Sequence, residues 1–230
     1  MSEPALRRPY IALCRALIAA AAVTGITIEC VHADPLRVFT FFTVLTNAAI
    51  AITFAWSAHR AWTGRPPLSP RITGAVLLCI VITGLVYHLV LANESSGFSE
   101  AEHLAKRTGD LVLSNQLLHT VTPVTVTLDW LLLTTPARFQ WRYAYQWLAL
   151  PLAYAAFALL RGALIDPPNR YPYPFLDVDL HGYPAVLRNA VVLALAFSAL
   201  ALLLITLDRT RPRLPTQENR ISSPAPRPLK

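Results

Sequence analysis

Charged residues are scarce in this sequence of 230 residues. Asp, Glu, Lys and Arg together make up only 14% of it, whereas 54% of the residues are hydrophobic. Soluble domains usually carry about 25% charged residues. The scarcity of charge therefore excludes an ordinary soluble domain and predicts an integral membrane protein.

Acidic residues are the rarer charged class, with 13 Asp and Glu against 20 Lys and Arg and a formal net charge of +7. An excess of this size can indicate nucleic-acid binding. Here most arginines lie in short connections between apolar segments or near the C-terminus, where positive-inside topology places them. We therefore predict membrane lipids as partners, and no nucleic acid.

Cysteine is also rare, and the familiar enzyme signatures are missing. Cys14, Cys30 and Cys79 fall within or at the end of apolar segments without paired spacing, which predicts neither a disulfide framework nor a metal site. The sequence contains no G-x-S-x-G elbow, H-E-x-x-H, P-loop or G-x-G-x-x-G motif. We expect no cofactor and no metal.

Six apolar segments are long enough to cross a bilayer, which requires about 20 residues. They cover 10–30, 38–57, 72–92, 111–134, 143–160 and 185–207. The connections leave no room for a soluble domain, so we predict an all-α bundle of six transmembrane helices over residues 1–208. Residues 209–230 are basic and proline-rich, which predicts a disordered tail.

The first segment allows a second interpretation, as a signal peptide. Arg7 and Arg8 precede it, and residues 31–33 resemble a cleavage site. The apolar run is longer than the roughly 7 to 15 residues of a secretory core and contains Arg15. These features favour a membrane span.

Basic residues predict the orientation of the bundle. One side holds Arg7, Arg8, Arg60, Arg65, Arg71, Arg138, Arg142, Arg209, Arg211 and Arg213. The other side holds Arg37, Lys106, Arg107, Arg161 and Arg170. The more basic side is cytoplasmic by the positive-inside rule, so both termini are predicted to be cytoplasmic.

The segment 111–134 is long and apolar enough to cross a bilayer, yet it carries Asn115, His119, Thr122 and Asp129. At about 100° per residue, the other three fall within roughly 80° of His119 and predict one polar stripe. Such groups must face protein or water rather than lipid. Pro123 removes a backbone donor and frees a carbonyl near His119, which neighbouring threonine hydroxyls can satisfy. We predict an intramembrane site on this helix.

The second span presents Thr40, Thr43, Thr46 and Asn47 on about one third of its circumference. With cytoplasmic termini, the second and fourth spans both begin outside. Thr43 then lies ~8 Å deep and His119 ~12 Å deep, at 1.5 Å per residue. We therefore predict that the two meet in the outer leaflet.

A hydroxyl beside an imidazole is suited to nucleophilic catalysis, because the base can take the hydroxyl proton. Asn115 is one turn from His119 and is placed either to orient the ring or to donate to an oxyanion. A different class of function also fits. Threonines in membrane helices often bond to their own carbonyls or join helices. The chain is then a non-catalytic six-span protein or a small lipid or solute carrier.

Other polar residues offer weaker alternatives. The third span ends with Tyr87 and His88, and the acidic segment 93–110 is expected to form a short surface helix. The segment 166–184 contains five prolines and is expected to form a rigid cap on the bundle. A metal amidase would use His88, His119 and His181 with Asp177 or Asp179. A bis-histidine haem would use His88 and His119.

Arg15 and Asp129 form a separate prediction on the cytoplasmic side. Each lies about five residues from that end of its span, or ~8 Å deep. An unpaired charge there costs about 2.5 to 3.5 kcal/mol, so we predict that the two face each other or share a polar network. The alternative is that Arg15 extends to the membrane interface.

Three pieces carry a resemblance to a known family: FFTVLTN at 41–47, NQLLHTVTP at 115–123 and YPYPFLD at 171–177. They are similar to the androgen-induced and androgen-dependent TFPI-regulating protein family and its bacterial six-span relatives. The similarity covers most of the chain at a low level. It implies a bacterial inner-membrane hydrolase of fatty acid esters of hydroxy fatty acids.

By this resemblance Thr43 is the catalytic nucleophile and His119 its base. Thr40 and Thr46 lie close enough in sequence to compete with Thr43 for that role. Six further residues are expected to shape the site: Asn47, Asn115, Thr122, His88, Tyr171 and Asp177.

Overall fold

The computed structural model describes residues 8–167 and 170–212, and every regular element in these ranges is a helix. Four helices are long and apolar enough to cross a membrane. They are α1 (Pro9–His32), α4 (Pro70–Val86) extended by the π turn η1 (Tyr87–Leu91), α8 (Tyr143–Leu164) and α9 (Val178–Thr210). The predicted all-helical class is confirmed, and these four helices fit a membrane protein.

The two helices that carry the predicted site complete the bundle. One is α3 (Phe42–Trp62). The other is a continuous run of α6 (Asp110–Gln116), η2 (Leu117–Val121), α7 (Thr122–Leu128) and η3 (Asp129–Leu133). The apolar pattern predicts that the second span starts at residue 38. Residues 35–38 instead form the separate short helix α2 (Pro35–Val38), and the backbone turns at 39–41 before α3 begins.

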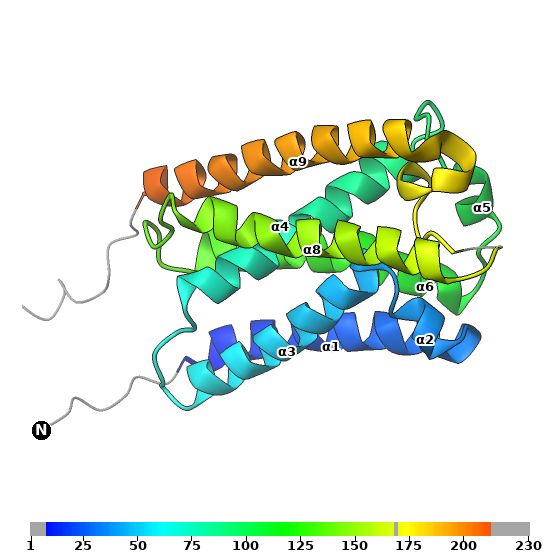
Figure 1. Ribbon diagram of the computed structural model, residues 1–230. Helices are drawn as coiled ribbons and strands as arrows, with labels where there is room; N and C mark the ends of the chain where they lie inside the picture. The colour runs from blue at the N-terminus through cyan, green and yellow to red at the C-terminus, as the bar shows by residue number, and fades with distance from the viewer. Residues whose placement is uncertain (1–7, 168–169, 213–230) are drawn as a thin grey trace, which may run out of the picture.

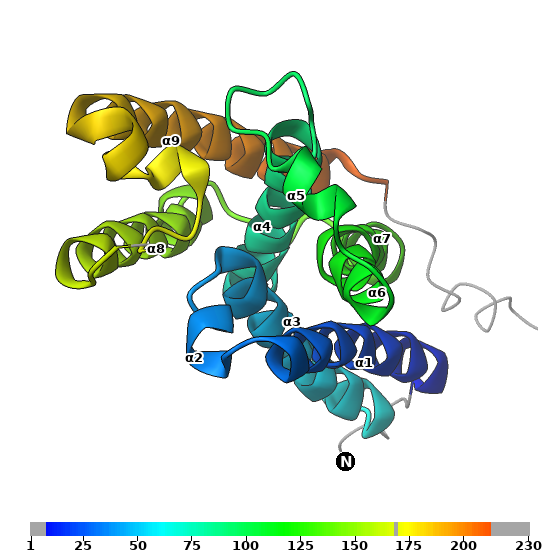
Figure 2. The same ribbon diagram turned by 90° about the vertical axis from the view of Figure 1, so that its right-hand side faces the viewer.

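Helix α4 forms the centre of the bundle. Figure 2 shows it surrounded by the α8–α9 pair, the α1–α3 pair and the α6–α7 run. In the most apolar 18-residue stretch of this helix, 61% of the residues are buried. In the corresponding stretches of the other three apolar helices, 33% or fewer are buried. Close packing against α8 depends on Gly74, because a Cβ there would lie 2.0 Å from the Trp147 ring. The central helix is thus the common partner of the helices that build the site.

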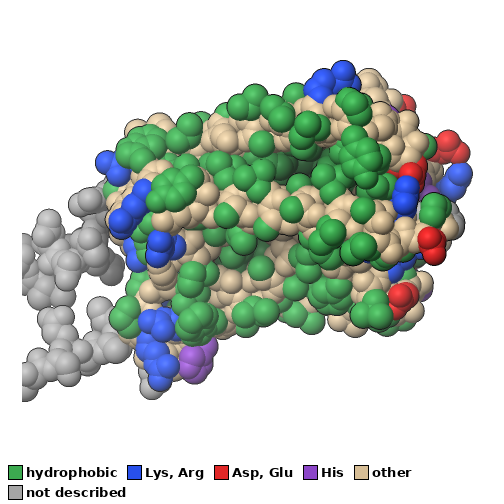
Figure 3. All heavy atoms as spheres, viewed as in Figure 1, with side chains coloured by type: hydrophobic (Ala, Val, Ile, Leu, Met, Phe, Trp, Pro, Cys, Tyr) green, Lys and Arg blue, Asp and Glu red, His purple; other side chains and the backbone are tan. Residues whose placement is uncertain are grey.

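The two ends of the bundle differ in charge. The first described helix begins, and the last ends, at the same end of the bundle (Figure 1). Lys and Arg side chains gather at that end in Figure 3, acidic side chains gather at the opposite end, and hydrophobic side chains cover the face between them. Helix α9 continues to Thr210, two residues into the predicted tail, and residues 213–230 lie outside the described ranges.

Asp208 fastens α9 to the turn between η3 and α8 (Tyr143–Leu164). Its carboxylate is fully buried and accepts hydrogen bonds from the backbone N–H groups of Arg138 and Phe139, both at 2.8 Å. It also accepts from the Trp130 indole at 3.2 Å and pairs with Arg211. This carboxylate, at the edge of the predicted sixth span, is a structural residue that the apolar pattern does not reveal.

The helix carrying His119 changes its winding where the proline enters. The Thr122 N–H bonds to the Leu117 carbonyl, five residues back, and so closes the π turn η2. Pro123 follows at once, and its ring crowds the carbonyl four residues earlier, which favours a wider turn. The Thr122 hydroxyl bonds to the Leu118 carbonyl at 3.3 Å. A threonine hydroxyl thus bonds to a carbonyl one residue before His119, as the sequence predicts.

The proline-rich segment after α8 packs onto the bundle, as expected for a cap. Its 3₁₀ turn η4 (Pro174–Leu176) places Phe175 and Leu176 in a buried cluster with Leu91 and Val186. The acidic segment contains the short helix α5 (Ala101–Ala105). Both segments lie at the end of the bundle where α3 and α6 begin (Figures 1 and 2).

Candidate active site

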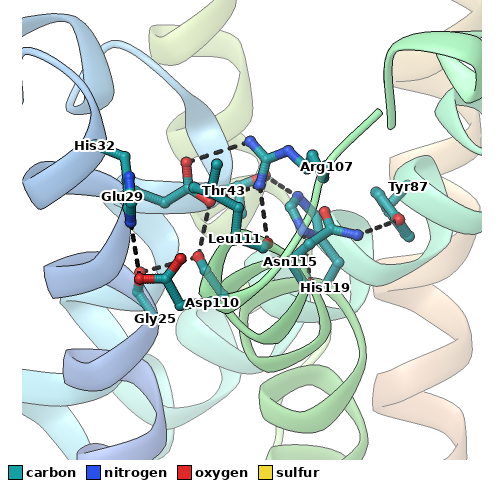
Figure 4. Close-up of polar contacts among 11 residues, drawn as sticks. Gly25, Glu29, His32, Thr43, Tyr87, Arg107, Asp110, Leu111, Asn115 and His119 are labelled. Carbon is teal, nitrogen blue, oxygen red and sulfur yellow. Dashed lines mark hydrogen bonds and ion pairs between the residues drawn. The ribbon is translucent and has the colours of Figure 1, made fainter. Parts of the chain in front are cut away.

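Thr43 and His119 are brought together by two helices that begin at the same end of the bundle. Thr43 is the second residue of α3, and His119 lies in the π turn η2. The distance from Thr43 Oγ1 to His119 Nε2 is 3.2 Å. Thr43 is buried, and the His119 ring faces a cavity. Figure 4 shows the two side chains pointing at each other.

The backbone fixes the tautomer of the His119 ring. Nδ1 lies 3.0 Å from the Asn115 carbonyl oxygen. A carbonyl oxygen only accepts, so Nδ1 must carry the proton and donate it. In the neutral ring Nε2 is then an acceptor, and the Thr43 hydroxyl donates to it. Tyr87 stacks on the ring at a centroid distance of 4.2 Å and holds its plane.

Tyr173, on the segment that caps the bundle, completes the immediate surroundings of Thr43. Its hydroxyl oxygen accepts from the Thr43 backbone N–H at 3.3 Å and lies 3.4 Å from Thr43 Oγ1. Burial raises the pKa of the Tyr173 hydroxyl above its usual value. The phenol therefore keeps its proton at neutral pH and remains a donor.

Asn47 and Thr122 stabilise the positions of Thr43 and His119 through buried hydrogen bonds. The Asn47 amide is fully buried and donates to the Thr43 carbonyl at 2.9 Å and to the Leu118 carbonyl at 3.1 Å. Its oxygen accepts from the Thr122 hydroxyl at 2.7 Å. The amide thus ties α3 to the π turn one residue before His119. Neither side chain lines the cavity.

A cavity of about 110 Å³ opens beside Thr43 and His119. Its walls come from α3, α4, α8, α9 and the Tyr173–Leu176 segment. Along α9 it extends from Ala190 to Ser198, or ~12 Å at 1.5 Å per residue. In Figure 3 the molecular surface is hollowed between α8 and α9, and hydrophobic side chains line the hollow.

The polar groups in the wall of this cavity are mostly turned away from it. The hydroxyls of Thr83 and Ser198 donate to the carbonyls of Cys79 and Ala194, four residues back on their own helices. The Tyr154 hydroxyl donates to the Thr40 carbonyl at 3.0 Å. Among the described residues that line the cavity, the polar groups able to meet a ligand therefore lie at the end that holds Thr43, His119 and Tyr173.

Several residues expected to shape the site lie elsewhere. Tyr171 packs against Gly162, where an added Cβ would lie 2.0 Å from its ring, and does not line the cavity. Asp177 caps the start of α9 by accepting from the Asp179 and Leu180 N–H groups. His88 is exposed and lies 3.1 Å from the Thr120 hydroxyl.

The polar residues of the α6–η3 run do not form the single stripe that regular spacing predicts. The Asn115 amide donates to the Tyr87 hydroxyl on the neighbouring helix, so it orients His119 through its backbone rather than its side chain. Thr122 bonds to α3, and Asp129 bonds to α1. The π turn η2 lies between Asn115 and Thr122 and breaks the regular spacing.

An ion-pair network lies where α1 ends and α6 begins. The Arg107 guanidinium contacts both oxygens of Glu29, the nearer at 2.7 Å, and Ser114 donates to the same carboxylate. His32 pairs with Asp110 beside it (Figure 4). The hydrogen bond to His32 lowers the pKa of the Asp110 carboxyl. These contacts fasten α1 to the start of the helix that carries His119.

The described residues do not support the metal and haem alternatives. Within 8–167 and 170–212, no three His, Cys, Asp or Glu side chains come close enough together to hold a metal ion. His181 stacks edge-on against Phe98, and His88 stacks edge-on against Tyr87. The histidines of both alternatives are therefore engaged in aromatic contacts.

Arg15 and Asp129 form a second buried polar centre at the opposite end of the bundle. Arg15 Nε lies 2.9 Å from one Asp129 oxygen, and Nη2 lies 3.1 Å from the other, so the pair is bidentate. Arg15 also donates to the Ser57 hydroxyl at 2.9 Å. Both charged residues are only 7% exposed. Arg15 therefore does not extend to the membrane interface.

Comparisons of this chain with family models, curated proteins and solved structures find no match.

Proposed function

We propose that this protein is an integral membrane hydrolase that cleaves long-chain lipid esters with Thr43 as nucleophile and His119 as general base. The observation that carries the proposal is the hydrogen bond from Thr43 Oγ1 to His119 Nε2, with Nδ1 tied to a carbonyl oxygen. This arrangement leaves Nε2 ready to take the hydroxyl proton. A nucleophile, its base and a group that orients the base are the general signature of such sites.

The reaction proceeds in two halves. Thr43 Oγ1 attacks the ester carbonyl carbon while His119 Nε2 takes the hydroxyl proton, and the carbonyl electron pair moves to oxygen. The carbon–alkoxy bond then breaks, and His119 returns the proton to the departing alcohol. Water attacks the acyl-threonine with its proton passing to His119. Thr43 leaves with that proton, so ester and water give acid and alcohol.

The cavity supports a substrate with one polar group at the end of an apolar chain. Its walls are apolar except at the end that holds Thr43 and His119, and the hydroxyls farther along bond to their own helices. An alkyl chain gains about 0.8 kcal/mol for each methylene group buried. The hollow between α8 and α9 suits entry of such a chain from the lipid side.

The resemblance to the androgen-induced and androgen-dependent TFPI-regulating protein family agrees with this chemistry. By that resemblance, the substrates we propose are fatty acid esters of hydroxy fatty acids or similar lipids. The same resemblance suggests residence in the bacterial inner membrane. The role proposed for the tyrosine of the YPYPFLD segment passes from Tyr171 to Tyr173, because Tyr173 contacts Thr43.

We also propose that α3 and the α6–η3 run cross the membrane with the four apolar helices, giving six spans with both termini cytoplasmic. The proposal is supported by the basic residues gathered at one end of the bundle. Alkaline phosphatase fused to the C-terminus should remain in the cytoplasm and be inactive. The same enzyme fused into the connection between α4 and α6 should reach the periplasm and be active. Activity of the C-terminal fusion, or a mature protein beginning near residue 34, would reverse the assignment of sides.

A fluorophosphonate probe tests the nucleophile directly. Purified protein should become labelled as Thr43 Oγ1 displaces fluoride from phosphorus and His119 takes the proton. Thr43→Ala should not be labelled, whereas Thr46→Ala should label at the parent rate. Labelling of Thr43→Ala at the parent rate would assign the reaction to another residue. Absence of labelling in the parent would favour the non-catalytic carrier.

A further inference from the structure

We propose that Tyr173 is a third catalytic residue, whose hydroxyl stabilises the oxyanion formed when Thr43 attacks the ester carbonyl. This inference rests on the proposed hydrolase function. The attack places negative charge on the former carbonyl oxygen, and a hydrolase needs donors aimed at that position. One of the two roles predicted for Asn115 is that its amide donates to the oxyanion. That amide instead donates to Tyr87 and is not directed at Thr43.

The hydrogen bonds around Thr43 leave the Tyr173 proton free for this task. The Thr43 hydroxyl proton goes to His119 Nε2, because Nδ1 of that ring is already a donor. The Thr43 backbone N–H donates to the Tyr173 oxygen at 3.3 Å. The phenol proton then has only Thr43 Oγ1, at 3.4 Å, as a neighbouring acceptor among the contacts of the described residues.

Formation of the tetrahedral intermediate improves the position of this donor. The oxyanion is attached to the carbon that Thr43 Oγ1 has just bonded, so it lies close to that oxygen. A hydroxyl 3.4 Å from Oγ1 is within reach of it. Before attack the contact with Oγ1 is long, and a shorter bond becomes possible only with the charged intermediate. Such an interaction lowers the barrier because it strengthens in the transition state.

The phenol is held rigidly, as a preorganised donor must be. Tyr173 is 8% exposed. Its ring stacks on Phe175 at 5.2 Å and meets Phe41 and Tyr154 edge-on at 5.9 and 6.2 Å. The hydroxyl stays protonated because burial raises its pKa. Donation to a developing charge therefore requires no rearrangement of the loop.

The start of α3 also favours negative charge beside Thr43. Thr43 is the second residue of this 21-residue helix, and no side chain caps the helix at Phe41. The first N–H groups of a helix have no acceptor within it, and their dipoles favour negative charge. The oxyanion would form near this end of the helix, where the Thr43 N–H donates to the Tyr173 oxygen. Tyr173 and the helix start therefore act on one position.

The substitution Tyr173→Phe tests the assignment, because it keeps the ring and removes only the hydroxyl. Turnover (kcat) on a soluble long-chain p-nitrophenyl ester should fall by about 10²- to 10³-fold, as for loss of one oxyanion donor, with little change in KM. Tyr171→Phe is the matched control and should keep kcat, because it removes a hydroxyl from the same segment at a ring that packs against Gly162 and does not line the cavity.

Ketone inhibitors separate oxyanion stabilisation from a structural role. A long-chain alkyl trifluoromethyl ketone reacts with the nucleophile to give a tetrahedral oxyanion, whereas the matching methyl ketone binds largely as the intact ketone. Tyr173→Phe should weaken the trifluoromethyl ketone by about the same factor as kcat and leave methyl ketone binding unchanged. Equal loss for both ketones would show that Tyr173 only shapes the cavity.

The outcomes also distinguish this inference from the proposed function. If Thr43→Ala keeps full activity, the hydrolase mechanism itself is wrong. If Thr43→Ala is inactive but Tyr173→Phe keeps its kcat and its trifluoromethyl ketone affinity, only the role of Tyr173 is refuted. Should Tyr173→Phe fail to fold, a fluorotyrosine at position 173 keeps the hydroxyl and changes its acidity. An unchanged kcat with that residue would equally refute the role.

Discussion

The variants Thr43→Ala, His119→Ala and the double variant should be almost equally inactive on a long-chain ester. Each should lose about 10³-fold or more of kcat/KM. A nucleophile and its base act as a unit, so the second substitution has little left to remove. Initial rates with protein in lipid nanodiscs, compared with heat-inactivated protein, measure the effect.

Neighbouring threonines provide the controls for this experiment. Thr40 bonds through its hydroxyl to the Arg37 carbonyl at 2.7 Å, and Thr46 is buried on the same helix as Thr43. Thr40→Ala and Thr46→Ala should keep activity within a few-fold. If the two losses at Thr43 and His119 multiplied instead of overlapping, the residues would act independently. The proposed pair would then have to be abandoned.

Replacing Asp129 with Asn should destabilise the protein by about 3 to 5 kcal/mol in the free energy of unfolding. The substitution leaves the Arg15 guanidinium buried at 7% exposure without its bidentate partner. Removal of one member of a buried ion pair costs more than the pair contributes, because the remaining charge is not solvated. Unfolding in mixed micelles against increasing denaturing detergent measures the change.

The double variant Arg15→Met with Asp129→Leu is the informative control. Apolar residues of similar volume often replace a buried ion pair with no loss of stability. This variant should therefore recover most of the stability that Asp129→Asn loses. Ester hydrolysis should be unaffected, because the pair contributes no atom to the cavity beside Thr43. A fully stable Asp129→Asn protein would show that Arg15 finds another partner or reaches water.

The pairing of Thr43 with His119 was predicted from three observations: similar depth along their helices, polar stripes on both helices, and the family resemblance, which singles out these two residues. Once the sides are assigned, the rise per residue places each polar group in one leaflet. The same reasoning placed Arg15 beside Asp129, and the structure has that pair at 2.9 Å. In both cases the two residues lie at similar depth on different helices.

Depth did not reveal which tyrosine of the capping segment enters the site. Residues 171 and 173 belong to a proline-rich loop that has no helical period, so sequence spacing does not indicate which ring points inward. The direction follows from tertiary contacts. Tyr171 fills the space left by Gly162, and Tyr173 stacks on Phe175 and reaches the start of α3. Neither contact has a local sequence signal.

The polar stripe was predicted from uniform α-helical spacing, and that assumption fails at η2. Polar side chains on this helix bond to three different helices, through Asn115, Thr122 and Asp129. Pro123 signals a local irregularity, but it does not tell whether the helix will kink or widen. Here it widens, and the extra backbone length lies at the residue that contacts Thr43.

The π turn η2 also determines where this chain can change length. A π turn holds one more residue than the α-helical turn it replaces, so it stores a single-residue insertion. Deleting a residue there lets the helix close as a regular α-helix, and Asp129 keeps its direction toward Arg15. The same deletion within α7 rotates Asp129 by about 100° away from its partner. Natural length variation in this helix is therefore expected at Leu117–Val121, where it alters the position of the imidazole without disturbing the ion pair.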